Sequence, residues 1–259
     1  NNNVMKSCLF NFFLPINNKF VQLVCIAIFL VFVGCNKETS NDTAYKSNFA
    51  NSKQTTLPEL EYSANNIKEW KVFNNRIECL VSDKERKIHL LTRKLGNQNG
   101  NLEMKVRLGF FNAKISSLNK NWAGFHIGSS TDFTNSIPSM YKKGINIGMC
   151  TNGALFIGTP SPNHKNPIII DALKNGVDLK ISISNHLDNY TIDFSVLDST
   201  NGKVLGRISK RGIAPEQIKG DLALISSFEN SEKNTTNSKK SVWFQDWEIK
   251  GSKVAIHKN

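Results

Sequence analysis

Apolar and polar side chains alternate with a period of two along several short runs of this chain. In the run 102–108 the apolar positions are separated by Glu103, Lys105 and Arg107. The runs 179–183 and 192–196 alternate in the same way. Because successive side chains of a β-strand point to opposite faces, each run predicts a strand with one buried and one wet face. The chain is therefore expected to be an all-β protein with a hydrophobic core.

Turn-forming residues separate these runs. Asn152-Gly153 lies between the apolar runs 145–150 and 154–157, which predicts a hairpin with a tight type I′ turn. The stretches 186–189 and 198–202 predict further turns. Residues 213–219, with Pro215 near their start, predict one short helix, and 222–228 and 242–249 predict the last strands. With no βαβ alternation and no repeat period, the expected fold is an antiparallel β-sandwich.

The N-terminal part has the features of a bacterial lipoprotein leader. An apolar run, 21–33, follows Lys6 and Lys19 and ends at Gly34-Cys35. The run has the length of a signal-peptide core and is short for a membrane span. The ending resembles a lipobox, although Phe32 stands where leucine is usual. We expect a signal peptide over 1–35 and lipidation of Cys35, which would anchor the protein to a bilayer of the cell envelope; an uncleaved anchor helix is the alternative.

The rest of the chain divides by composition. Residues 36–66 are rich in Asn, Ser, Thr and Lys, which predicts a flexible polar tether. The β-sandwich is expected over 67–254, and 255–259 are expected to begin a linker or a truncated C-terminal region.

The charge of the chain favours anionic partners. The formal net charge is +12, and Lys6 and Lys19 are the only charged residues before Cys35, which leaves +10 from Cys35 onward. Such a surface attracts acidic glycans or lipid headgroups, although scattered lysines also occur simply as a solubilising surface. Because the leader directs the protein away from the cytoplasm, an anionic polysaccharide is expected as the ligand rather than a nucleic acid.

Familiar enzyme motifs are absent from the sequence: it has no His-Glu-x-x-His, Gly-x-Ser-x-Gly or Cys-x-x-Cys. His89 and His126 lie in apolar runs and are interpreted as packed strand histidines, and His186 is interpreted as part of a hairpin turn. Cys79 and Cys150 are too few for a disulfide scaffold, and buried free thiols are expected. No catalytic residue, metal ligand or cofactor is predicted, but an enzyme with an unrecognised site stays open.

The aromatic residues are the remaining candidates for a binding site. Trp70, Trp122, Trp243 and Trp247 either stack on sugar rings or pack inside the sandwich, and packing is favoured. On a regular strand Trp243 and Trp247 would point to the same face of the sheet, and the pattern does not decide whether that face is buried or exposed. The candidate ligand-binding residues are Tyr141, Lys142 and Lys143, just before the strand that begins near Gly144, and Trp122, within another strand.

Five segments of the chain look familiar when taken together, namely 76–81, 89–92, 121–128, 143–148 and 243–249. They resemble the concanavalin A-like (laminin-G-like) jelly-roll module. More narrowly, they are similar to the amino-terminal module of bacterial lipoproteins of the alkaline phosphatase D (PhoD-like) family. The resemblance implies a noncatalytic module that binds a glycan or serves as a scaffold for a partner domain. The alternative that it implies is the N-terminal fragment of a metal-dependent phosphatase, whose catalytic domain would follow and whose metal ligands have no matching position in this chain.

Overall fold

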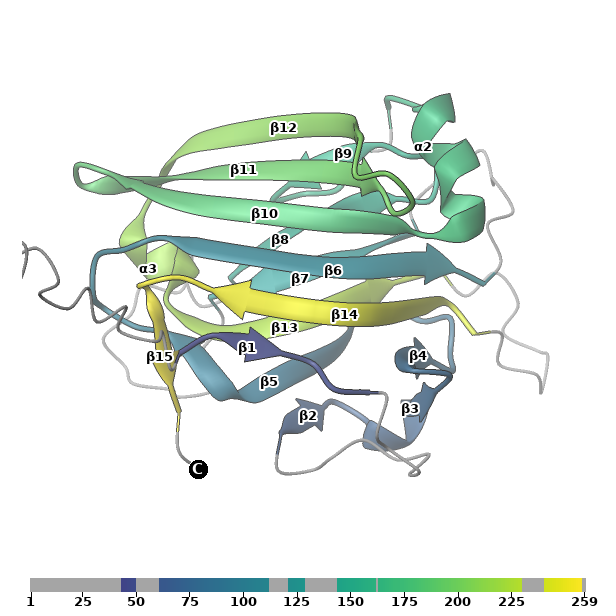
Figure 1. The fold of residues 1–259 in the computed structure, drawn as a ribbon, viewed down its shortest axis with the longest axis horizontal. Helices are drawn as coiled ribbons and strands as arrows, with labels where there is room; N and C mark the ends of the chain where they lie inside the picture. Colours follow the sequence, from purple (N-terminus) through teal and green to yellow (C-terminus); the bar gives the residue numbers. More distant parts are fainter. Residues whose placement is uncertain are drawn as a thin grey trace, which may run out of the picture. The chain divides into compact units, whose positions relative to one another are not determined.

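Two antiparallel β-sheets face each other in the computed structural model (Figure 1), which describes residues 43–49, 61–111, 121–128, 144–161, 163–229 and 240–257. The all-β sandwich expected from the alternating runs is confirmed. The leader with Cys35, and Tyr141, Lys142 and Lys143, lie outside the described residues. No helix in the described ranges is long and apolar enough to cross a membrane.

Sheet A has the strand order β12-β11-β10-β6-β14-β4-β3, and β1 pairs with the C-terminal half of β14. In Figure 1, β12, β11, β10, β6 and β14 run across the front of the view, and β7, β8 and β13 lie behind them. The strands of sheet A are β1 (Tyr45–Lys46), β3 (Trp70–Phe73), β4 (Arg76–Cys79), β6 (Leu102–Phe110), β10 (Val177–His186), β11 (Asn189–Asp198), β12 (Val204–Ile213) and β14 (Val242–Lys250).

Sheet B has the order β15-β5-β13-β7-β8-β9, and β2 pairs with β5. Its strands are β2 (Tyr62–Ala64), β5 (Arg86–Leu95), β7 (Trp122–Ile127), β8 (Ile145–Cys150), β9 (Leu155–Ile157), β13 (Gly220–Ser227) and β15 (Val254–Ile256). The predicted short helix is present as α3 (Pro215–Ile218). The connections also contain η1 (Ile67–Glu69), α2 (Pro167–Ala172) and η2 (Leu173–Asn175), which the sequence interpretation did not include.

The core lies between the two sheets and is built by the predicted alternation. In β6 the apolar side chains at 102, 104, 106 and 108 are fully buried, while the polar side chains between them remain partly exposed. The apolar positions of β10 and β11 are buried in the same way. Full burial of an aliphatic side chain contributes roughly 1.5–3 kcal/mol, so this layer is the main source of stability. Cys79 and Cys150 are buried free thiols, as expected.

A β-bulge in β14 determines on which face of sheet A Trp243 and Trp247 lie. Gln245 pairs with Arg107 of β6 and Glu248 pairs with Lys105, so β14 carries one extra residue against its partner. Asp246 has a φ of +51° at this place. The extra residue reverses the alternation, as a bulge does. Trp247 is therefore completely buried, whereas Trp243 is half-buried on the outer face of sheet A.

Two hairpins show the local turn chemistry. Between β8 and β9 the hairpin is present, but the predicted type I′ turn is wrong: only Gly153 has a positive φ, +80°. The Gly153 N–H donates to the Cys150 carbonyl, and the Cys150 N–H donates to the Ala154 carbonyl, which makes a three-residue loop. The two-residue turn with both φ values positive occurs between β3 and β4, at Asn74 and Asn75. The turn predicted around His186 is confirmed between β10 and β11.

The predicted tether over 36–66 is wrong for part of its length. Tyr45 and Tyr62 are 8% and 2% exposed, and their hydroxyls are hydrogen-bonded to each other. Tyr45 belongs to β1 of sheet A and Tyr62 to β2 of sheet B, so this pair joins the two sheets. Phe49 packs beside Tyr62. Because the segment is polar on average, its composition gave no sign that these three aromatic residues pack against the sandwich. Their apolar surface is enough to hold this part of the segment there. At the other end β15 extends the sandwich two residues beyond 254.

Strand β12 is the last strand of sheet A, and side chains of α2 and β9 lie beside its Gly206. Its pairing with β11 is interrupted by two register shifts, between Tyr190 and Ile192 and between Val196 and Leu197. Most of its side chains are exposed, including those of Arg207, Lys210 and Arg211.

Candidate functional site

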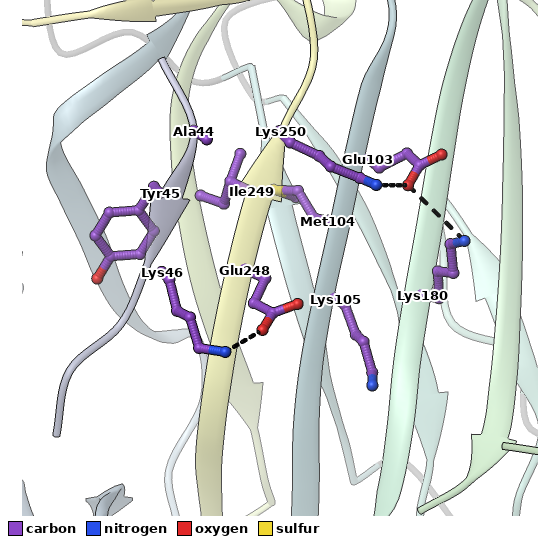
Figure 2. Close-up of a pocket in the computed structure, with 10 residues that line it drawn as sticks. All are labelled: Ala44, Tyr45, Lys46, Glu103, Met104, Lys105, Lys180, Glu248, Ile249 and Lys250. Atoms are coloured by element: carbon purple, nitrogen blue, oxygen red, sulfur yellow. Dashed lines mark hydrogen bonds and ion pairs between the residues drawn. The ribbon is translucent and has the colours of Figure 1, made fainter. Parts of the chain in front are cut away.

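A groove of about 410 Å³ lies on the outer face of sheet A, where β1, β14, β6 and β10 run side by side (Figure 2). The alternation that buries Leu102 and Met104 turns Glu103 and Lys105 of β6 outward into this groove. The other three strands contribute in the same way. The groove is lined by Ala44, Tyr45, Lys46, Glu103, Met104, Lys105, Lys180, Glu248, Ile249 and Lys250.

The register of sheet A brings one lysine from each of these four strands into the groove. Lys46 is paired with Glu248, Glu248 with Lys105, and Lys105 with Lys180, which makes one row across the sheet. Lys250 lies in the next row, opposite Glu103. Lys105 and Lys180 are directly opposite each other, and like charges in that position destabilise a sheet. With four lysines and two glutamates, the lining carries an excess of two positive charges.

Ion pairs hold the lysines of the groove in place. The Lys46 Nζ donates to Glu248 Oε1 at 2.7 Å, and the hydrogen bond and charge of Glu248 raise the pKa of Lys46. Figure 2 shows Glu103 between Lys250, at 3.1 Å, and Lys180, at 3.8 Å. Lys105 pairs with Asp178, a neighbour outside the groove, at 2.8 Å. The pairs made by Lys46, Lys180 and Lys250 are exposed and contribute little stability, so these three lysines can exchange a carboxylate for an anionic ligand.

The geometry of the groove suits binding better than catalysis or metal coordination. Both of its glutamates are engaged by lysines. Across the parts of the chain that the structure describes, no group of three or more His, Cys, Asp or Glu side chains is arranged to hold a metal ion. The groove presents lysine ammonium groups above the backbone of the strands, and this arrangement can bind anions.

Among the candidate residues predicted from the sequence, only Trp122 lies in the described part. It belongs to β7 of sheet B and is 6% exposed, with its ring edge-on to Phe156 at 5.1 Å. It packs in a small cluster with Cys150, Ala154 and Ile225. The structure therefore does not bring Trp122 to the groove on sheet A, and its surroundings are those of a packing residue. Cys35, Tyr141, Lys142 and Lys143 lie outside the described residues, and their assigned roles stay predictions.

The strand histidines sit in packed surroundings. His126 is 2% exposed, and its Nδ1 donates to the Asn146 Oδ1 at 2.6 Å. Burial, together with the charge of Lys87, lowers the pKa of His126 to about 4 despite the opposing effect of the Asn146 hydrogen bond. His89 lies 3.9 Å from Asp221, and burial lowers its pKa as well. Both residues are consequently neutral at pH 7, as packed strand histidines are.

The lysines of the groove were missed as a site although two of them lie in correctly predicted strands. Lys105 and Lys180 are 75 positions apart, and only the register between β6 and β10 brings them together. The available signal was the repeated use of charged residues at the outward positions of the runs 102–108 and 179–183.

Comparisons with known proteins bear on the fold. No family model matches the sequence, and no curated protein matches it. Among solved structures, the basic winged bean lectin with Tn-antigen is similar with a TM-score of 0.50 and 9% identity, over 83% of this chain and 100% of that chain. Arcelin-5, a lectin-like defense protein from Phaseolus vulgaris, has a TM-score of 0.50 and 8% identity, over 81% of this chain and 99% of that one.

At such low identity these likenesses establish the fold alone. None of the comparisons links the chain to PhoD-like phosphatases, so the narrower resemblance has no support beyond the sequence segments that suggested it. The sandwich of this chain belongs to the concanavalin A-like, lectin-like jelly-roll folds.

Proposed function

We propose that this domain is a noncatalytic glycan-binding module whose groove on sheet A takes an acidic or sulfated polysaccharide. The observation that carries the proposal is the convergence of four lysines from four strands, with an excess of two positive charges, in one groove of about 410 Å³. The net charge of +10 from Cys35 onward, which is +12 less Lys6 and Lys19, adds a long-range attraction for a polyanion. The jelly-roll fold supports the same idea, since the winged bean lectin that shares it was solved with Tn-antigen.

The test compares acidic and neutral polysaccharides in affinity electrophoresis at two salt concentrations. We expect retention by acidic polymers only, and weaker retention at higher salt, because charges are screened over about 8 Å at physiological ionic strength. The double substitution Lys105→Gln/Lys180→Gln should weaken binding about tenfold or more, since each lost ion contact costs on the order of 1 kcal/mol.

A matched control separates the groove from net charge. Lys84 and Lys165 are exposed and do not line the groove. Lys84→Gln/Lys165→Gln removes the same charge and should change the affinity less than about twofold. Equal weakening by both double variants would mean that binding follows the overall charge and not the groove. Equal retention by neutral and acidic polymers would contradict an electrostatic site.

The same proposal places the module at the cell envelope through lipidation of Cys35. Replacing Cys35 with serine should abolish fatty-acid labelling and leave the protein either unanchored or unprocessed, because acylation of this thiol is the step that the leader predicts. Cys25→Ser, within the apolar run of the leader, is the control and should keep both properties. Labelling that survives in Cys35→Ser would refute the lipoprotein assignment. A catalytic partner domain of the PhoD-like kind is not part of this proposal, because no described residue favours it.

A further inference from the structure

We propose that a cation–aromatic cluster on the same outer face of sheet A is a second site, which takes one carboxylated or sulfated sugar unit. The cluster surrounds Glu78 and consists of Lys71, Phe73, Arg76, Phe111, Lys240 and Trp243. It rests on the proposed function in one respect, namely that the ligand is an acidic glycan.

The strand register brings the cluster together. Lys71 of β3 is paired with Glu78 of β4, Glu78 with Trp243 of β14, and Trp243 with Gly109 of β6. These positions alternate with buried ones such as Ile77, so their side chains point to the outer face. The bulge in β14 is what puts Trp243 on this face. The cluster is therefore part of the same surface as the groove.

The charges of the cluster do not balance. Glu78 is fully buried, and one of its oxygens accepts from the Arg76 Nε and Nη2 at 2.9 and 2.8 Å. The other oxygen accepts from the Lys240 Nζ at 2.8 Å, with the Lys71 Nζ at 3.7 Å. Burial by itself would raise the pKa of Glu78, but the hydrogen bonds and charges of Lys240 and Arg76 outweigh burial and lower it. Among the residues that the structure describes here, one carboxylate faces three cations, which leaves an excess of two positive charges for a ligand.

Three aromatic rings lie beside the three cations that surround Glu78. The Lys71 Nζ lies 4.5 Å from the centre of the Phe73 ring, and Lys240 lies 5.0 Å from the Phe111 ring. Arg76 lies 5.0 Å from the Trp243 ring. Phe73 is 45% exposed, an unusual position for a large apolar side chain. Contacts of this type hold the ammonium and guanidinium groups beside the ring faces.

Close approach of Trp243 to backbone also shapes the cluster. A Cβ atom at Gly109 would lie 2.4 Å from the indole, and one at Gly176 would lie 2.7 Å from it. The missing side chains at these two positions leave room for the indole against the sheet. Trp243 is thereby held in one place while staying half-buried on the outer face. The fixed indole in turn supports the guanidinium of Arg76, which lies over its ring.

This combination fits an acidic sugar better than a simple anion. The C–H face of a sugar ring suits an exposed aromatic ring, and a carboxylate or sulfate on the same ring can pair with the surplus cations. The groove lacks such rings, because Tyr45, its aromatic residue, is buried. The cluster should therefore bind a short acidic sugar that the groove alone does not hold.

One glycan chain can use both places. Lys105 in the groove and Gly109 beside Trp243 are four residues apart on β6, which is about 14 Å along a strand. Arg107 lies between them and donates to Asp178 at 2.9 Å. A ligand of several sugar units is needed to reach from the groove to the cluster, whereas a disaccharide is expected to occupy the cluster alone.

The test measures the affinity of disaccharides and hexasaccharides from polygalacturonate and from heparin, by calorimetry on the full chain. Phe73→Ala, which changes no charge, should weaken the hexasaccharide about fivefold and remove detectable disaccharide binding. Lys240→Gln should have the same effect. The control for Phe73→Ala is Ile256→Ala on β15, where the side chain is 44% exposed, and it should change neither affinity. Circular dichroism checks that each variant is folded.

The outcomes distinguish this inference from the proposed function. Lys105→Gln/Lys180→Gln should weaken the hexasaccharide and leave the disaccharide unchanged. If that groove variant has no effect while Phe73→Ala does, the cluster stands and the groove assignment is wrong. If Phe73→Ala and Lys240→Gln leave both ligands unaffected, the cluster is a structural ion-pair network and the inference is overturned. Absence of glycan binding, or retention only on vesicles of anionic lipid, would overturn both.

Discussion

Replacing Trp247 with alanine is expected to lower the free energy of unfolding by about 3–5 kcal/mol, the usual cost of removing a fully buried large aromatic side chain. Trp247 is completely buried in the main core, and its ring lies 5.9 Å from that of Tyr45 in an edge-on arrangement. Its removal would open a cavity beneath β1 and loosen the join between the two sheets. Urea unfolding followed by far-UV circular dichroism measures the change.

Trp243→Ala is the matched control on the same strand. The sequence pattern gives the two tryptophans the same parity, but the bulge at Asp246 puts Trp243 on the outer face. Its loss should cost clearly less than the loss of Trp247, because the indole is only partly buried, although it removes both the contact with Arg76 and the packing on Gly109 and Gly176. Similar unfolding midpoints for the two variants would contradict the bulge and the burial that follows from it.

Gly124→Ala is expected to cost about 3 kcal/mol or more, although the change adds a single methyl group. A Cβ atom at Gly124 of β7 would lie 2.2 Å from the Ile147 carbonyl oxygen and 2.6 Å from the Gly148 Cα of β8. Both obstacles are backbone atoms of the neighbouring central strand, so a side-chain rotation cannot relieve the contact. The two strands would have to separate, which weakens the middle of sheet B.

Gly206→Ala provides the comparison for this change. At Gly206 the nearest atoms to an added Cβ are the terminal carbons of Ile169 and Leu155, both at 3.1 Å. Flexible side-chain ends can yield by a few tenths of an ångström, so the cost should stay below about 1 kcal/mol. Thermal unfolding of the two variants beside the parent protein checks the difference. A stable Gly124→Ala protein would mean that β7 and β8 are not packed as closely as described.

The main strands could be predicted from the sequence because their alternation is a local property. The runs 102–108, 179–183 and 192–196 need no knowledge of their partners to show which face is buried. The same reasoning failed in β14, because a bulge inserts one residue and changes the parity without a clear signal in the sequence. It also failed at β1 and β2, where Tyr45 and Tyr62 are isolated within a polar segment.

The candidate site was less predictable than the fold, for a related reason. Its parts come from strands far apart in the sequence: Lys46, Lys105, Lys180 and Lys250 meet only after the register of sheet A is known. Net charge suggested the class of partner that is proposed above, but net charge does not say where on the fold that partner would bind. The predicted loop with Tyr141 combined charge and an aromatic ring, and the same combination occurs around Glu78, on strands where the sequence indicated only structure.

The position of β12 at the end of sheet A has a consequence for the behaviour of the protein at high concentration. Unpaired backbone groups on an edge strand are a template on which another chain can add a strand, the first step of edge-to-edge aggregation. Here two register shifts interrupt the regular ladder, and Lys210 and Arg211 of β12 are exposed. A second copy approaching in the same way would bring its own cations against these. The irregular, charged β12 therefore disfavours the addition of a strand at this end of sheet A.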